Sequence, residues 1–255
     1  MVLSPSDSSC GLTIVGVGPG DPELITVAAQ RAIRSAQVVA YPVADLAREG
    51  MAARIAAPWL QPEQQRLPLL FPMVEAAAPR RQAWHAAADA VAACVQLGQA
   101  VVFLCEGDSS TYASASYLLL ALQQRQPHCP VRMLPGITAA AAAAAEASSL
   151  GMPWPLALQQ ERLLIQPTPD GPELLRPLLL NCRSSGQPLV LLKLGRRWLW
   201  VRPLLEELGL LESAIYGERV GWPQQRLCPA GQVPAVECPY FSLLLLRFSW
   251  PEVLP

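Results

Sequence analysis

The sequence predicts an α/β protein made of two halves. Short apolar, β-branched runs alternate with helical segments along the chain, and three of these runs end in a glycine-bearing turn that precedes a helix start. At roughly 150 residues per domain, a chain of 255 residues suits one large domain or two modest ones. Two α/β halves fit best with a boundary near Pro135, and basic and acidic residues balance separately on each side of it. The expected domains are residues 10–134 and 135–255.

The first half opens with the pattern of a βαβ unit. Residues 12–17 form an apolar run typical of a strand that is buried on both faces. A turn through Gly16, Gly18 and Gly20 follows, and Asp21 and Pro22 suit the cap and first position of a helix over residues 22–36. Residues 37–41 then form a second predicted strand, which we expect Pro42 to close.

The pattern continues to the end of the chain. Residues 80–97 predict a helix and residues 100–105 a buried strand, after which Ser109 or Ser110 is expected to cap a helix from Tyr112 to Arg125. Residues 131–134 predict a strand, and Thr138 is expected to cap an alanine-rich helix. In the second half we expect strands over residues 163–166, 189–194, 215–220 and 242–248, with helices over residues 172–183 and 200–208.

The composition excludes several classes of protein. With 52% hydrophobic and 15% charged residues, the chain does not have the composition of a disordered protein. A net charge of -1 provides no electrostatic footprint for DNA or RNA, so no nucleic-acid partner is expected. Two histidines, and cysteines without a Cys-x-x-Cys pair, supply few metal ligands, so we expect no metal site. Free thiols and an N-terminus without a signal-peptide pattern favour a cytoplasmic protein.

Residues 133–160 form the most apolar tract and raise the question of a membrane span. The tract carries one charge, Glu146, but prolines and glycines interrupt it and its middle is alanine. We therefore expect a closely packed helix and no membrane partner.

The three glycine-bearing strand ends are the candidate site. Ligands of open α/β sheets gather beyond the carboxyl ends of the strands, so the turns at Gly18, Gly107 and Gly136 could together form a cleft. Asp21 occupies the third glycine position of a dinucleotide-binding fingerprint, and its charge would repel a pyrophosphate. Glu106 and Asp108 could bind a ligand or could simply cap a helix. The residues alone therefore indicate an α/β enzyme, without its substrate.

Taken together, these segments resemble the tetrapyrrole methylase family of S-adenosylmethionine-dependent methyltransferases. Residues 15–26 (VGVGPGDPELIT) are similar to the opening motif of the family, Glu106-Gly107-Asp108 to its second motif and residues 135–139 (PGITA) to its third. The resemblance implies a two-domain fold, with a mainly five-stranded mixed sheet flanked by helices in each domain and an active site in the interdomain cleft. It also implies a homodimer and a small-molecule tetrapyrrole substrate.

Within the family, the closest resemblance is to the members that methylate precorrin-2 at C20 in cobalamin biosynthesis. Residues 39–42 (VAYP) and residues 105–108 (CEGD) carry it. The uroporphyrinogen methylases typically have aspartate where Pro42 stands and glycine where Glu106 stands. Methylation of uroporphyrinogen III and non-catalytic tetrapyrrole binding remain the alternatives, and the sequence leaves open whether the substrate carries cobalt.

The resemblance also implies the site residues. S-adenosylmethionine would be the methyl donor and S-adenosylhomocysteine the product. Tyr112, Glu106 or a water could take the proton that leaves the methylated carbon, and Tyr41 and Pro42 would line the tetrapyrrole trough. The cofactor contacts carried over by position are Pro19, Glu106, Gly107, Asp108, Thr111, Tyr112, Thr138, Ala139, Lys193, Leu194, Val220 and Gly221.

Overall fold

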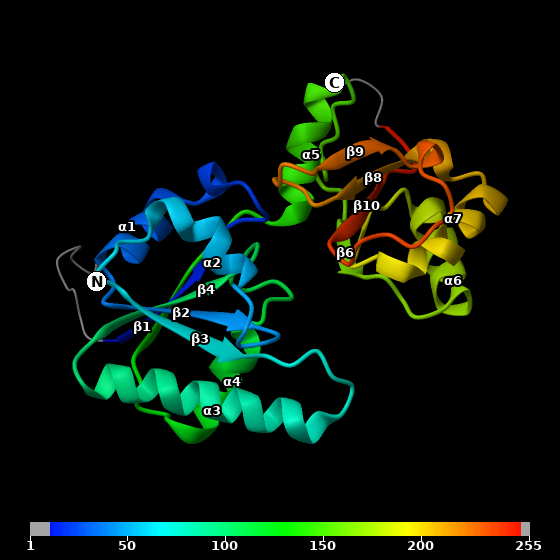
Figure 1. Ribbon diagram of the computed structural model, residues 1–255. Coiled ribbons are helices and arrows are strands. Elements are labelled where there is room, and N and C mark those ends of the chain that lie inside the picture. Colours follow the sequence, from blue (N-terminus) through cyan, green and yellow to red (C-terminus); the bar gives the residue numbers. More distant parts are fainter. Residues whose placement is uncertain (1–10, 251–255) are drawn as a thin grey trace. The chain divides into compact units, whose positions relative to one another are not determined.

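The computed structural model describes residues 11–250, which fold as two compact units (Figure 1). One unit ends at Thr138 and the other begins at Ala139. Each unit contains one five-stranded sheet with its own hydrophobic core. The structure therefore confirms the expected α/β architecture with two five-stranded sheets.

The first unit contains a wholly parallel sheet, with the strand order β3-β2-β4-β1-β5. Its strands are β1 (Gly11–Gly16), β2 (Val38–Val43), β3 (Gln65–Leu70), β4 (Ala100–Cys105) and β5 (Val131–Leu134). The apolar runs of β1 and β4 lie in the interior of the sheet, as expected for strands covered on both faces. Because β4, β1 and β5 are neighbours and parallel, their carboxyl ends meet at one edge.

Helices cover both faces of this sheet. Figure 1 shows α1 and α2 on one face and α3 and α4 on the other. Side chains of α3 and α4, including Val91 and Leu118, pack with Ile14 and Phe103 of the sheet in one buried cluster. The α-helices are α1 (Val27–Ser35), α2 (Met51–Ala56), α3 (Ala77–Gln96) and α4 (Ala115–Arg125), and short 3-10 helices cover Pro22–Leu24 and Ala57–Trp59.

The helix predicted over residues 22–36 is wrong as a single element. Asp21 does cap a helical turn, since its Oδ1 accepts a hydrogen bond from the Glu23 amide at 2.8 Å, but that turn is a short 3-10 helix. Ile25 then adopts an extended conformation with a ψ of 128°. A second cap, Thr26, accepts a hydrogen bond from the Ala29 amide at 3.2 Å and starts α1.

Pro42 does not close the second strand but lies inside β2. The pairing of β2 with β4 ends at Ala40, and beyond that residue β2 pairs only with β3. Proline, which has no backbone N–H to donate, is tolerated in a strand where one side has no hydrogen-bonded neighbour. Two elements that the sequence did not predict, β3 and α2, lie in this region.

The helix predicted from Tyr112 is also wrong at its start, because α4 begins at Ala115. Tyr112 has a φ of 52°, in the left-handed region. The Ser109 hydroxyl donates to the Leu134 carbonyl at 2.9 Å, and the Ser110 hydroxyl donates to Asp108 Oδ1 at 2.5 Å. Neither serine caps α4, and the residues after Asp108 form an irregular loop.

The second unit contains a mixed sheet with the order β6-β7-β10-β8-β9, in which only β6 and β7 are parallel. Its core contains Trp198, Tyr216 and Leu244, all fully buried. The strands are β6 (Leu164–Pro167), β7 (Leu189–Leu192), β8 (Ala214–Glu218), β9 (Arg226–Pro229) and β10 (Ser242–Leu246), and the helices are α5 (Ala139–Ser149), α6 (Pro172–Ser185) and α7 (Trp198–Glu207). The sequence predicted four of these strands and missed β9.

The alanine-rich tract forms α5, a helix of 11 residues. Among residues 11–250, no helix is long and apolar enough to cross a membrane.

Candidate functional site

The three glycine turns meet at the carboxyl edge of the first sheet. Gly16 ends β1, Gly107 follows β4 and Gly136 follows β5. A Cβ atom added to Gly136 would lie 2.2 Å from the Gly107 carbonyl oxygen, and one added to Gly16 would lie 2.7 Å from the Gly136 nitrogen. Real Cβ atoms do not approach backbone this closely, so glycine is required where the three turns pack together.

Hydrogen bonds join the first and second of these turns. The Gly18 amide donates to the Gly107 carbonyl at 3.2 Å, and the Gly107 amide donates to the Gly18 carbonyl at 2.8 Å. Both residues have positive φ angles, 77° and 68°, which glycine adopts without steric cost. These two hydrogen-bonded turns therefore extend the edge of the sheet. Together with the Gly136 turn that packs against them, we call them the platform.

Asp108 joins the second turn to the third. Its Oδ2 accepts a hydrogen bond from the Gly136 amide at 3.0 Å, while its Oδ1 accepts bonds from Ser110 and Thr111. Partial burial opposes ionisation of this carboxyl, but the hydrogen bonds from Ser110, Gly136 and Thr111 outweigh it and hold the pKa of Asp108 below its usual range. Asp108 is therefore an ionised acceptor at neutral pH.

Glu106 lies two residues earlier in a different electrostatic environment. Loss of hydration raises the pKa of its carboxyl to about 7, so protonated and ionised forms coexist near neutral pH. The neighbouring Cys105 thiol donates to the Val15 carbonyl at 3.4 Å. Burial and the nearby charges of Asp108 and Glu106 raise the pKa of Cys105 to about 12, so this thiol is unreactive and Glu106 is the group suited to proton transfer.

The first unit thus brings together most of the predicted site residues that lie in it. Pro19 follows Gly18 in the hydrogen-bonded turn, and Thr111 binds Asp108 through its hydroxyl. Tyr112 lies on the same loop with 48% of its surface exposed. Thr138 is the last residue of the first unit, and Ala139 begins α5 in the second.

The other predicted contacts lie at strand ends of the second unit. Lys193 and Leu194 follow β7, whereas Val220 and Gly221 follow β8. Both strands are antiparallel to β10, so their carboxyl ends flank its first residue, Ser242. The Leu194 amide donates to the Ser242 carbonyl at 3.1 Å, which holds this edge together.

Backbone conformation marks this second edge, and sequence analysis missed that signal. Lys193 and Arg219 have φ angles of 60° and 48°, in the left-handed region that residues other than glycine seldom adopt. Such strain is found preferentially at functional sites. No local pattern reveals it, because neither residue is a glycine or an asparagine.

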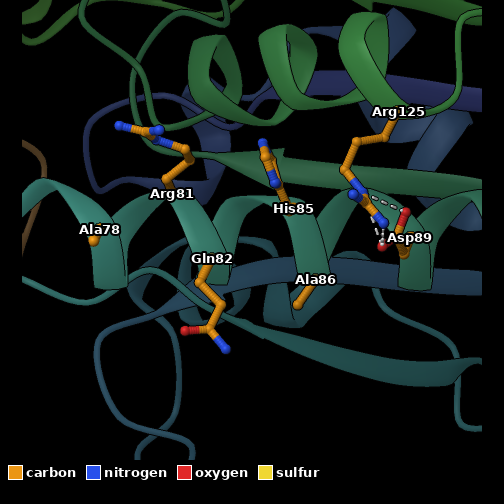
Figure 2. Close-up of a pocket in the computed structure, with 7 residues that line it drawn as sticks. All are labelled: Ala78, Arg81, Gln82, His85, Ala86, Asp89 and Arg125. Carbon is orange, nitrogen blue, oxygen red and sulfur yellow. Dashed lines mark hydrogen bonds and ion pairs between the residues drawn. The ribbon is translucent and has the colours of Figure 1, made fainter.

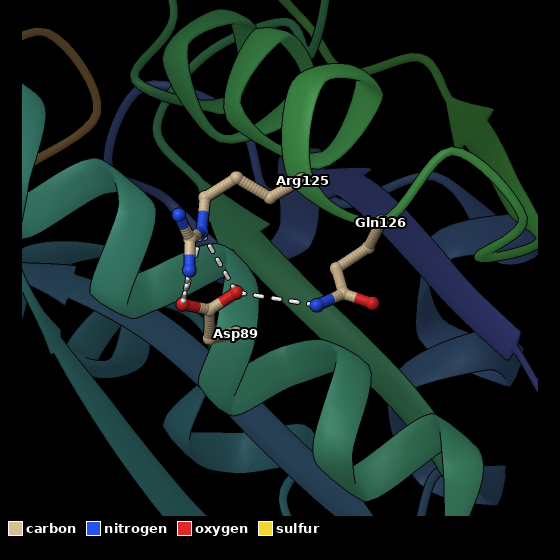
Figure 3. Close-up of polar contacts among 3 residues, drawn as sticks. All are labelled: Asp89, Arg125 and Gln126. Carbon is tan, nitrogen blue, oxygen red and sulfur yellow. Dashed lines mark hydrogen bonds and ion pairs between the residues drawn. The ribbon is translucent and has the colours of Figure 1, made fainter.

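A cavity of about 460 Å³ lies elsewhere, between α3 and α4 (Figure 2). Arg125 of α4 forms a two-pronged ion pair with Asp89 of α3, with nitrogen–oxygen distances of 2.6 and 2.9 Å, and Gln126 donates to the same carboxylate (Figure 3). These bonds, chiefly the one from Arg125, hold the pKa of Asp89 below its usual range. The cavity contains none of the predicted cofactor contacts, although Arg81 is one of the arginines that could bind tetrapyrrole carboxylates, and its charged lining links two helices. It is lined by Ala78, Arg81, Gln82, His85, Ala86, Asp89 and Arg125.

The part of the chain that the structure describes shows no group of side chains suited to bind a metal ion. Nowhere in residues 11–250 do three His, Cys, Asp or Glu side chains gather where they could hold a metal ion.

The geometry described above is that of an α/β protein with a candidate ligand site at glycine-rich ends of parallel strands. The model of the tetrapyrrole (corrin/porphyrin) methylases matches residues 11–233, and the chain belongs to this family. The match confirms the family that the three motifs predicted.

Proteins of known name with similar sequences include a cobalamin biosynthesis protein, CobIJ, of Mycobacterium tuberculosis, which is 36% identical over 91% of this chain. The chain spans only 45% of the length of that protein. A precorrin-2 C(20)-methyltransferase of Sinorhizobium is 34% identical and is covered over 95% of its length by 93% of this chain. A cobalt-precorrin-2 C(20)-methyltransferase of Salmonella typhimurium is 28% identical, with 94% of this chain and 97% of that protein covered.

Solved structures of low sequence identity share the fold. A cobalt precorrin-4 methyltransferase superimposes with a TM-score of 0.68 at 19% identity, covering 97% of this chain and 98% of the other. A uroporphyrin-III C-methyl transferase from Thermus thermophilus, complexed with S-adenosyl homocysteine, superimposes with a TM-score of 0.60 at 21% identity, covering 93% and 92%. These structures confirm the two-domain fold.

Proposed function

We propose that the chain is an S-adenosylmethionine-dependent C-methyltransferase of cobalamin biosynthesis that methylates precorrin-2, or its cobalt-bearing counterpart, at C20. The convergence of the three glycine turns at one sheet edge is the observation that carries this proposal, because it supports a single site built from the three family motifs. The relatives named for methylation at C20 of precorrin-2 and of cobalt-precorrin-2 support the substrate class. Together, these relatives support a substrate with or without cobalt.

The residues at the sheet edge fit a methyl donor with an extended polar surface. A Cβ added to Gly107 would meet no atom closer than the Ile137 carbonyl oxygen at 4.0 Å, so open space lies above this backbone. We propose that Pro19, Glu106, Gly107, Thr111 and Tyr112 line the donor site, and that Asp108, on the same loop, supports it. The contacts proposed beyond this loop are Thr138, Ala139, Lys193, Leu194, Val220 and Gly221.

The proposed chemistry needs little acid–base machinery. S-adenosylmethionine supplies an activated methyl group, and a reduced tetrapyrrole supplies an electron-rich carbon. The residues of this chain would hold the two in line, a contribution that can reach about 7–11 kcal/mol. Glu106, with a pKa of about 7, can accept the proton that leaves the methylated carbon, and the exposed Tyr112 is the second candidate.

The proposal has two further parts, the first supported by the family resemblance and the second by the free thiols of the described cysteines. The protein acts as a homodimer, and it acts in the cytoplasm, where its thiols stay reduced. Sedimentation of the purified protein measures the first of these directly.

Anaerobic incubation with precorrin-2 and methyl-labelled S-adenosylmethionine tests the function. We expect one labelled methyl per product molecule, located at C20 by NMR. Label transferred instead to uroporphyrinogen III would support the sibling activity, and donor-independent tetrapyrrole binding without transfer would support a carrier. A matched pair, Gly107→Ala and Gly151→Ala, controls for backbone strain, because both glycines have φ near 70° but only Gly107 lies at the site.

A further inference from the structure

The carboxylate of Asp108 is occupied by donors from the protein itself. Its Oδ1 accepts hydrogen bonds from the Ser110 amide at 2.9 Å, the Ser110 hydroxyl at 2.5 Å and the Thr111 hydroxyl at 3.3 Å. Its Oδ2 accepts the bond from the Gly136 amide at 3.0 Å. Each carboxylate oxygen has about two lone-pair sites, so protein donors fill Oδ1 completely and the Gly136 amide takes one of the two sites on Oδ2.

We propose that Asp108 is a positioning residue that holds the third motif against the second, rather than a direct ligand of the methyl donor. The proposal rests on the proposed function for its effect on catalysis. The three bonds to Oδ1 are local, because they come from Ser110 and Thr111, two and three residues later. The bond to Oδ2 is different, because it reaches Gly136 at the end of another strand.

The hydrogen bond from the Gly136 amide to Asp108 can hold Gly136 in place and so affect the geometry of the site. Gly136 lies beyond the end of β5, an edge strand whose pairing with β1 stops at Leu134. Its backbone nonetheless packs between Gly16 and Gly107 with no room for a Cβ atom. Thr138, a proposed donor contact, follows two residues later. A shift of Gly136 would therefore move both the platform and the segment that leads to Thr138.

The substitution Asp108→Asn separates the tertiary bond from the local ones. The amide oxygen of asparagine can keep the position of Oδ1, where three donors converge. Its NH2 group then faces the Gly136 amide, and two donors cannot bond to each other. Ser110→Ala is the matched control, because it removes one local bond to Oδ1 and leaves the Gly136 bond in place.

Amide exchange followed by NMR on the ligand-free protein tests the positioning step without any assay of function. We expect the Gly136 amide to exchange roughly tenfold faster in Asp108→Asn than in the wild type, the fold-change for loss of one charge-assisted hydrogen bond. Ser110→Ala should leave this amide unchanged. Thermal melting of each variant shows whether the fold is retained, and the exchange of core amides in β4 provides the internal reference.

Titration with S-adenosylhomocysteine and steady-state kinetics test the consequence. Asp108→Asn should weaken donor affinity by roughly tenfold, while kcat at saturating donor stays near the wild-type value. Weaker affinity with unchanged Gly136 exchange would overturn the proposal in favour of a direct contact. Faster exchange with unchanged affinity would also overturn it. If the wild type itself binds no S-adenosylhomocysteine, the proposed function fails, and the exchange result alone decides whether Asp108 holds Gly136.

Discussion

Glu106 and Asp108 lie two residues apart, but their environments shift their pKa values in opposite directions. Asp108 accepts four hydrogen bonds and stays ionised. Desolvation brings the pKa of Glu106 to about 7. Two carboxyl groups with separated pKa values can take different roles in one site. Asp108 is a fixed acceptor, and Glu106 is the group that can change its protonation state at physiological pH.

This difference predicts a pH effect on stability. The folded-state pKa of Glu106 lies above its ordinary value, so the folded protein binds the extra proton and its free energy of unfolding falls as the pH rises toward 7. Glu106→Gln removes this titration. The melting temperature of the variant relative to the wild type should therefore be higher at about pH 9 than at about pH 5. A difference that stays constant with pH would contradict the shifted pKa.

Among the elements of the first unit, α1 has its C-terminal carbonyls bound by one buried side chain, that of Gln64. The Gln64 Nε2 atom donates to the Ile33 carbonyl at 2.6 Å and to the Ala36 carbonyl at 2.8 Å. Carbonyls in the last turn of a helix have no partner within the helix. Gln64 supplies one from a position 28 residues beyond Ala36. It therefore fixes the end of α1 before β2, a role that no local pattern at Gln64 indicates.

Gln64→Ala should lower the free energy of unfolding by about 1–3 kcal/mol, because buried carbonyls lose their donor. Gln65→Ala is the matched control, since the adjacent glutamine side chain is exposed. Chemical denaturation of both variants measures the difference. Equal and small losses in the two variants would show that water replaces the Gln64 amide at no cost.

At the scale of the whole molecule, each unit depends on its own core and its own polar contacts. In the second unit, the Arg247 side chain is fully buried, donates to Glu161 at 2.5 Å and donates to the Pro155 carbonyl at 3.1 Å. These bonds tie the chain beyond β10 to the segment before β6. A buried guanidinium that loses its carboxylate partner destabilises the folded state, so this ion pair contributes strongly to the stability of the second unit.

Glu161→Gln should destabilise the second unit by about 3 kcal/mol, because Arg247 stays buried without a charged partner. The control is Glu207→Gln, which breaks an exposed ion pair with Arg176 and should cost at most about 1 kcal/mol. Calorimetric unfolding of both variants provides the comparison. A loss from Glu161→Gln no larger than that from Glu207→Gln would mean that Arg247 finds other acceptors.

The amino-acid sequence alone is enough to predict the α/β class, the interior strands β1 and β4, and the three motifs of the candidate site. These features depend on local properties: continuous apolar runs predict strands covered on both faces, and glycines mark turns. β3 escaped prediction because it is an edge strand containing Pro68, with few buried residues to produce a pattern. The loop at Tyr112 escaped prediction because Ser109 bonds the Leu134 carbonyl of another strand and Ser110 bonds Asp108, so neither serine caps the helix.

The meeting of the three motifs at one sheet edge, by contrast, depends on tertiary structure. The order β4-β1-β5 differs from the order of the strands in the chain, and it alone brings Gly16, Gly107 and Gly136 within contact distance. The same is true of Asp108 and Glu106, whose opposite pKa shifts depend on neighbours and burial that residue type does not specify. Local sequence determines which turns can form, whereas the pairing of strands determines which turns meet.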